Sequence, residues 1–170
     1  MNIEGENFFR RDTLERPMPT ASAMFHHANR LRKAYHTVLA PLCRESGLPP
    51  MALDILLYVA NNPQSSTATQ ICENRGFKSA IVSVHIDRLA RAGLLCRSTD
   101  PADRRKTCLC CTEEAQPLIV RGGALQQSFG KALLAGLSPQ QIETMHACIS
   151  KIDANMDAML AAAGEEEPNA

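Results

Sequence analysis

Apolar residues recur every three or four positions along most of this chain, a spacing that predicts a mainly helical protein. Stretches such as Gly47-Leu-Pro-Pro and Asn61-Asn-Pro separate the periodic segments, because glycine and proline end helices. The expected helices cover residues 21–42, 51–60, 67–75, 78–92, a stretch from 112 onward, and 138–161. Thr67-Ala-Thr-Gln70 and Ser138-Pro-Gln-Gln141 carry the residues of helix N-terminal caps.

The helix expected at 78–92 has two distinct faces. Its apolar stripe repeats at i, i+3, i+4 and i+7, and Gly93 follows as the natural stop. That stripe consists of Val82, His85, Ile86 and Leu89. The opposite face is small, polar or basic and consists of Ala80, Ser83, Val84, Asp87, Arg88 and Arg91. Such a face fits a DNA major groove, although an ordinary amphipathic helix has the same pattern. Asp87 can pair with Arg91 one turn later.

Residues 94–98 and 106–111 are expected to form two short strands. The loop between them, Thr99-Asp-Pro-Ala-Asp-Arg-Arg, holds turn-forming residues and two adjacent guanidinium groups. A helix, a turn, a second helix and then a hairpin with a basic tip is the order of a winged helix-turn-helix.

Three segments resemble the MarR family of transcription regulators, and most of all its SlyA branch. They are Asp87-Arg-Leu-Ala-Arg-Ala-Gly-Leu-Leu, Asp103-Arg-Arg-Lys and Cys111-Thr-Glu-Glu-Ala-Gln-Pro-Leu-Ile, within a similarity over residues 25–160. The resemblance implies an all-α protein with a small β-wing, a winged helix-turn-helix with N- and C-terminal dimerisation helices. Periodicity alone leaves open a bundle of these terminal helices within one chain.

The expected organisation has five parts. They are a flexible N-terminal arm at 1–20, a dimerisation helix at 21–50, the winged helix-turn-helix DNA-binding domain at 51–111, C-terminal dimerisation helices at 112–161, and an acidic tail at 162–170. A dimer with a two-fold axis would present two identical reading helices about one DNA turn apart, matched to a pseudo-palindrome.

The candidate DNA contacts lie on the reading helix, just before it and in the wing loop. The resemblance implies that Arg105 enters the minor groove and that Asp103 holds its guanidinium. Ala80 and Val84 can touch thymine methyl groups but make no bidentate bonds to bases. The full set of candidates is Arg75, Ser79, Ala80, Ser83, Val84, Arg88, Asp103, Arg104 and Arg105.

The resemblance also implies a small aromatic or anionic effector, bound between the dimerisation helices and the winged domain. Such a ligand would release a repressor from its operator by favouring a spacing of the reading helices that mismatches the DNA. Tyr35, His36, Met51 and Tyr58 are the candidate ligand contacts.

Charge distribution supports the DNA assignment, although the net charge is zero. Residues 70–106 hold eight Lys and Arg against four acids, whereas residues 107–170 hold three against eight. The basic segment is therefore the one that contains the reading helix and wing. No run of about 18 apolar residues is present, so we expect a soluble, cytoplasmic protein without a membrane partner.

Seven cysteines without a secretory signal argue against a disulfide scaffold and are expected mainly to pack. The alternative function is a redox or metal sensor on the same fold, with Cys43 and Cys110 as the redox candidates. His26, His27 and His36 raise the metal question, but their spacing defines no ligand set, so we predict neither a metal nor a cofactor. Catalytic motifs are absent, so an enzyme is not expected. An interaction module that does not bind DNA is the more distant competitor.

Overall fold

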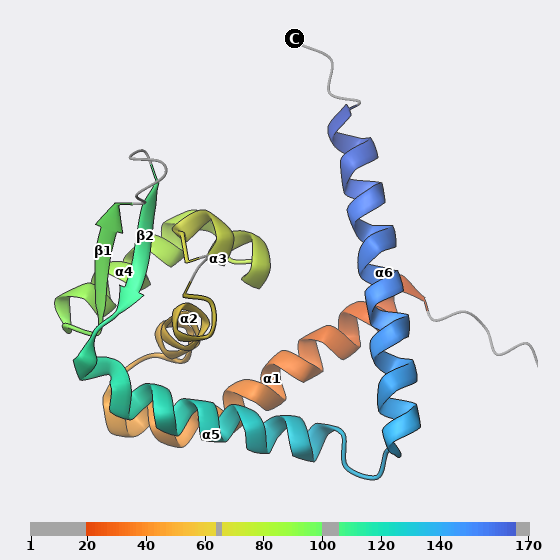
Figure 1. The fold of residues 1–170 in the computed structure, drawn as a ribbon, viewed down its shortest axis with the longest axis horizontal. Helices are drawn as coiled ribbons and strands as arrows, with labels where there is room; N and C mark the ends of the chain where they lie inside the picture. Colours follow the sequence, from red (N-terminus) through yellow and green to blue (C-terminus); the bar gives the residue numbers. More distant parts are fainter. Residues whose placement is uncertain (1–19, 64–65, 100–105, 166–170) are drawn as a thin grey trace, which may run out of the picture.

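The computed structural model of the protein describes residues 20–63, 66–99 and 106–165 (Figure 1). It is mainly helical and has one two-stranded sheet, as the sequence predicts. The elements are α1 (Ala21–Ser46), α2 (Pro50–Asn61), α3 (Ala68–Arg75), α4 (Ser79–Arg91), β1 (Leu95–Thr99), β2 (Thr107–Cys111), the 3₁₀ turn η1 (Glu113–Ala115), α5 (Gln116–Leu133) and α6 (Pro139–Glu165).

Helix α2 is the centre of the winged-helix part. Every residue from Ala52 to Val59 is buried, so this helix is covered on all sides. It packs against α1, α4, α5 and β2, and Figure 1 shows it enclosed by them. Its apolar run accounts for this position, because a helix that is hydrophobic all round is stable only inside a core.

The helix-turn-helix forms where the sequence predicts it. The capping box of α3 is complete: the Thr67 hydroxyl accepts a hydrogen bond from the backbone nitrogen of Gln70 at 3.2 Å, and the Gln70 side-chain oxygen accepts one from the backbone nitrogen of Thr67 at 3.0 Å. Gly76, with φ 64°, ends α3 in the left-handed region that favours glycine. In α4, Val82, Ile86 and Leu89 are buried, which confirms the predicted stripe.

The wing is an antiparallel hairpin in which Leu95 pairs with Cys111 and Cys96 with Cys110. Leu95 and Leu109 are buried and attach one face of the hairpin to the core. The far edge of β2 is also held, since Leu109 N donates to the Ser66 carbonyl at 2.7 Å. The loop at 100–105 lies outside the described residues, and with it the predicted wing contacts Asp103, Arg104 and Arg105.

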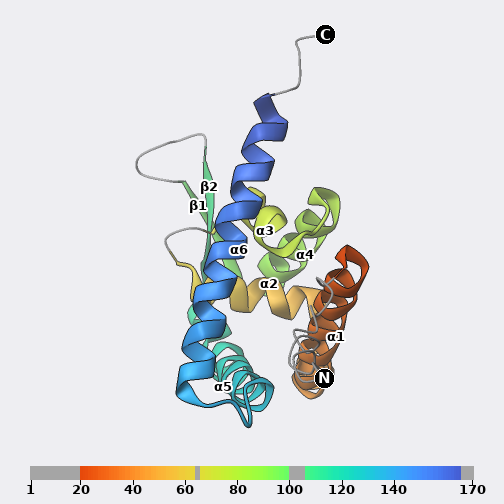
Figure 2. The same ribbon diagram turned by 90° about the vertical axis from the view of Figure 1, so that its right-hand side faces the viewer.

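Helices α1 and α5 form a layer beneath the winged-helix part, and α6 stands apart from it (Figures 1 and 2). Helix α1 contains Pro41 and continues one turn beyond the expected end at residue 42, to Ser46. The long helix expected from residue 112 begins instead with η1, after which Pro117 opens α5 in the first turn, where proline is tolerated.

Gly122 brings α5 unusually close to α2. A Cβ atom at this position would lie 2.5 Å from Leu57 Cδ2, inside van der Waals contact. Leu57 is only 1% exposed, so its side chain has little room to move away. The neighbouring Gly123 has nothing within 4 Å of such a Cβ. Helix propensity alone makes both glycines weak points of α5, whereas the structure gives Gly122 a packing role.

This difference predicts opposite effects of the same substitution at adjacent positions. Gly122→Ala should lower the free energy of unfolding by about 1–2 kcal/mol, because overpacking a core costs about 1–3 kcal/mol. Gly123→Ala should raise it by up to about 1 kcal/mol through the higher helix propensity of alanine. Urea unfolding followed by circular dichroism measures both. Equal effects of the two variants would show that α5 is not held against Leu57.

Candidate nucleic-acid interface and ligand cavity

The outer face of α4 is open to solvent along its length. Ser79, Ala80, Ser83 and Val84 are all exposed, Val84 at 61%. Small side chains allow the helix backbone to approach a DNA groove closely, and two hydroxyl groups at its N-terminal end can donate to phosphates. The face predicted from periodicity is therefore the exposed one, while the DNA contacts themselves remain a prediction.

The basic end of α4 is engaged within the protein. The Arg88 guanidinium donates to the carbonyl of Gly47, just after α1, at 3.0 Å. The Asp87 carboxylate pairs with Arg97 of β1 at 2.5 Å. Within the described residues, Arg91 donates to the backbone carbonyl of Asp87 at 3.3 Å and forms no ion pair with the Asp87 carboxylate, so the side-chain pair expected one turn apart on the helix is wrong. The Arg97–Asp87 pair forms instead, because β1 packs against α4 and brings the Arg97 guanidinium to the Asp87 carboxylate.

A cavity of about 440 Å³ lies where α1, α2, α3 and α5 meet. It is lined by aromatic rings, amides and several charged groups. The lining residues are Ala28, Leu31, Arg32, Tyr35, His36, Asp54, Asn74, Arg75, Phe77, Gln126 and Phe129. This cavity joins the terminal helices to the helix-turn-helix, because α3 belongs to one and α1 and α5 to the other.

Asp54 and Arg75 form an incomplete polar pair in the cavity wall. Asp54 is 4% exposed, and its Oδ1 lies 3.6 Å from an Arg75 terminal nitrogen, too far for a hydrogen bond. Within the described residues, Asp54 Oδ1 and Arg75 Nε have no hydrogen-bond partner. Burial raises the pKa of Asp54, and the nearby Arg75 and His36 partly oppose the shift. The Arg75 guanidinium also lies 5.2 Å from the centre of the Tyr58 ring.

Tyr35 forms the opposite wall. Its hydroxyl accepts a hydrogen bond from Gln126 at 2.7 Å, and its ring meets Phe129 edge-on at 5.5 Å. Burial raises the pKa of Tyr35, which keeps the hydroxyl protonated. The cavity therefore offers an aromatic wall and a polar wall to the same occupant.

The structure brings together only part of the predicted ligand set. Tyr35 and His36 line the cavity, whereas Met51 and Tyr58 do not. Tyr58 instead supports it from behind, accepting a hydrogen bond from Asn74 at 3.1 Å, and Met51 packs on the core. Arg75, a predicted DNA contact, faces this cavity. Sequence reasoning missed Asp54, although a lone acid in an apolar helix was a usable signal.

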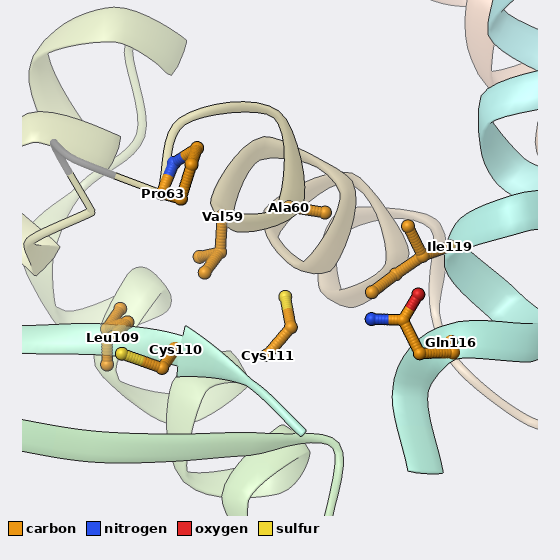
Figure 3. Close-up of a pocket in the computed structure, with 8 residues that line it drawn as sticks. All are labelled: Val59, Ala60, Pro63, Leu109, Cys110, Cys111, Gln116 and Ile119. Carbon is orange, nitrogen blue, oxygen red and sulfur yellow. The ribbon is translucent and has the colours of Figure 1, made fainter. Parts of the chain in front are cut away.

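A second cavity, of about 370 Å³, lies between α2, β2 and the start of α5 (Figure 3). Figure 3 shows the Cys111 side chain directed into it from β2, toward Val59 and Ile119. Burial raises the pKa of Cys111 to about 11, with smaller effects of Cys110 and Cys96. This thiol is therefore a packing group, as the sequence predicts for most of the cysteines.

The described residues give no support to a metal site. Over residues 20–63, 66–99 and 106–165, no three His, Cys, Asp or Glu side chains come together in a way that could hold a metal ion. Cys43, one of the two redox candidates, is only 7% exposed, and burial raises its pKa. In the same part of the chain, no helix has the length and apolar character needed to cross a membrane.

Residues 46–106 match the MarR family. A putative MarR family transcriptional regulator from Listeria monocytogenes, solved in complex with 26mer DNA, is similar with a TM-score of 0.69 and 14% identity, over 86% of this chain and 97% of that one. An uncharacterised SlyA-like regulator from the same species has a TM-score of 0.69 and 14% identity, over 85% of this chain and 96% of that one. BpsR of Bordetella bronchiseptica, whose DNA binding is regulated by 6-hydroxynicotinic acid, has a TM-score of 0.58 and 21% identity, over 76% of this chain and 98% of that one. The fold is the winged helix-turn-helix of these regulators, with their terminal helices.

The buried carboxyl of Asp54 predicts a pH dependence of stability. The folded protein holds this proton more tightly than the unfolded chain does. The contribution of protonated Asp54 to the free energy of unfolding is therefore fully present below about pH 4, the ordinary Asp pKa. It should be lost as the pH rises through the raised pKa of folded Asp54. Relative to Asp54→Asn, the wild type should therefore become less stable with rising pH in urea unfolding. Glu73→Gln, at an exposed position of α3, controls for the loss of a negative charge. A wild-type to Asp54→Asn difference that is constant with pH would contradict the prediction.

Proposed function

We propose that this chain, a MarR-family DNA-binding transcription regulator, acts as a homodimeric repressor on a pseudo-palindromic operator. The observation that carries the proposal is the open, small-residue face of α4 within the winged helix-turn-helix that matches the family. The similar SlyA-like structure supports assignment to that branch. Such a role requires access to the chromosome, in line with the expected cytoplasmic location.

The terminal helices support dimerisation. Helix α6 exposes an apolar stripe that the described residues leave largely uncovered, and Figure 1 shows the helix standing apart from the winged-helix part. The exposed apolar side chains of α6 are Ile149, Ile152, Met156, Met159 and Leu160. Because each is about half exposed or more, burying the remainder would contribute on the order of 1 kcal/mol apiece. A second copy, with the same stripe, covers them by symmetry. Residues 21–50 and 112–161 would then be the dimerisation segments and residues 51–111 the DNA-binding segment.

On DNA, each α4 would enter one major groove. Ser79 and Ser83 would contact phosphates, and Ala80 and Val84 would contact thymine methyl groups. Arg88 would act mainly by holding α4 to the end of α1, through its bond to the Gly47 carbonyl. The wing loop, with Asp103, Arg104 and Arg105, would reach the neighbouring minor groove.

The effector would bind in the 440 Å³ cavity at Tyr35 and Arg75. An aromatic carboxylate fits its two walls, because the ring can pack on Tyr35 and Phe129 while the anion pairs with the Arg75 guanidinium, whose side chain is 33% exposed. The similar regulator from Bordetella bronchiseptica responds to 6-hydroxynicotinic acid, a molecule of this class. Since Arg75 ends α3, a ligand that holds it moves the helix-turn-helix relative to α1 and α5, which changes the spacing of the two reading helices.

The salt dependence of duplex binding tests the proposed DNA interface. On a duplex selected from random sequences, affinity should fall steeply with salt, with a log–log slope of about −0.9 for each phosphate contacted. Val84→Ala should relax preference at one or two thymines per half-site and leave that slope unchanged, because it removes methyl contacts only. A slope near zero for the wild type would contradict DNA binding, and an unchanged sequence preference would contradict the assigned face of α4.

Ligand binding tests the proposed effector site. A panel of aromatic carboxylates that includes 6-hydroxynicotinic acid should contain compounds that raise the Tm and weaken operator binding. The matching amides should do neither. Arg75→Gln should weaken binding of such an acid by roughly tenfold to a hundredfold, the value of a charged hydrogen bond. It should keep operator affinity in the absence of ligand. If Arg75→Gln loses DNA affinity but keeps the ligand response, Arg75 contacts phosphate and the cavity assignment fails.

A further inference from the structure

The outer face of the wing carries three thiols in a small area. Side chains alternate along each strand, so Leu95 and Leu109 face the core while their neighbours face outward. The outward side chains are Cys96 and Ser98 on β1 and Cys108 and Cys110 on β2. Cys96 is exposed and Cys110 is half-buried, so a small oxidant can reach the pair.

Cys96 and Cys110 are direct cross-strand partners. The Cys96 thiol donates to the Cys110 carbonyl at 3.4 Å, and the Cys110 sulfur lies 3.4 Å from the Ser98 hydroxyl. Both side chains lie on the same face of the hairpin, because opposed residues of paired strands share a face.

The hydrogen-bond register sets the backbone separation of this pair. Thr112 N donates to the Leu94 carbonyl at 3.2 Å, which marks that opposed pair as hydrogen-bonded. Opposed pairs alternate between the two kinds, so Cys96 and Cys110, two residues further, are also a hydrogen-bonded pair. Their Cα atoms are then about 5.5 Å apart, a separation that disulfides commonly span.

We propose that Cys96 and Cys110 form a dithiol that a hydroperoxide oxidises to a disulfide across the wing. The more exposed Cys96 attacks first: its sulfur bonds to one peroxide oxygen, the O–O bond breaks, and the departing oxygen leaves as an alcohol or water with the thiol proton. The Cys110 sulfur then attacks the sulfenic sulfur, the S–O bond breaks, and water leaves with the second thiol proton. Two thiols lose two electrons in total, and the peroxide gains them.

The other thiols are placed less favourably. Cys111 points into the apolar cavity of Figure 3, where burial raises its pKa to about 11. Cys43 is buried in the core. Cys108 faces the Ser98 hydroxyl as its cross-strand partner rather than a thiol. Cys72 lies on α3 and Cys148 on α6, both outside the wing.

The disulfide would act on the part of the protein that meets DNA, a consequence that rests on the proposed function. Opposed Cβ atoms in strands lie about 4.5–5.5 Å apart, wider in hydrogen-bonded pairs, whereas a disulfide needs about 3.5–4.5 Å. Closing the bond therefore pulls the two strands together and twists the wing. Strand β1 is tied to α4 through Arg97 and Asp87, so the distortion reaches the reading helix as well as the loop.

The test treats reduced full-length protein with hydrogen peroxide and maps disulfides by peptide mass spectrometry without reduction. The expected result is a Cys96–Cys110 linkage, loss of two free thiols per chain, and recovery of both with dithiothreitol. Cys96→Ser and Cys110→Ser should each abolish the linkage, whereas Cys108→Ser and Cys148→Ser should retain it. A linkage of Cys110 to Cys108, a link between chains through Cys148, or no disulfide at all would overturn the proposal.

The second readout is operator affinity before and after oxidation. Oxidised wild type should bind about tenfold more weakly, the size of one lost groove contact, and Cys110→Ser should be insensitive to peroxide. Unchanged affinity of a fully oxidised protein would overturn the regulatory role of the disulfide. Reduced protein that binds no duplex would instead overturn the proposed function, while the mapped linkage still decides the chemistry.

Discussion

The close contact between Gly122 and Leu57 is the constraint from which the arrangement around the cavity follows. Because position 122 carries no side chain, α5 lies directly against the fully buried α2. Gln126 and Phe129 lie one and two turns further along the same face of α5. That register directs both toward Tyr35 of α1, so one missing methyl group helps to set the distance between the layer of α1 and α5 and the core of the winged domain.

Among the described residues, the wall of this cavity keeps a polar pair whose hydrogen bonds packing does not complete. A buried carboxylate needs charged hydrogen-bond partners, and Asp54 has a guanidinium nearby but beyond hydrogen-bond distance. Such a pair costs stability in the empty protein, and an occupant that completes the bonds of Arg75 recovers part of that cost. These polar atoms would give a ligand directional contacts that an apolar void lacks, which favours the proposed binding site over a packing defect.

Local signals in the sequence predicted most of the fold. The Thr67–Gln70 capping box, Gly76 and the stripe of α4 each depend on residues within one or two turns, so their structural outcome is readable from spacing. The site is different, because Tyr35, Asp54, Arg75 and Phe129 come from four helices and meet only through tertiary packing. Arg75 was assigned to DNA because basic charge near a reading helix suggests phosphate, while its actual neighbours are set by α2. The Arg97–Asp87 pair was missed for the same reason.

Helix α4 is held by polar ties that differ in kind from its packing. Its buried stripe fixes it within the winged domain, whereas Arg88 links it to the end of α1 and Asp87 links it to β1. Exposed ion pairs and hydrogen bonds of this type contribute about 1 kcal/mol or less each. Helix α4 is therefore fixed within the winged domain by its packing, while its polar ties to the end of α1 and to β1 add only weak restraint. The proposed ligand at Arg75 and the proposed disulfide at Cys96 would each act at one of these boundaries, so neither would have to unfold the core to change how α4 meets DNA.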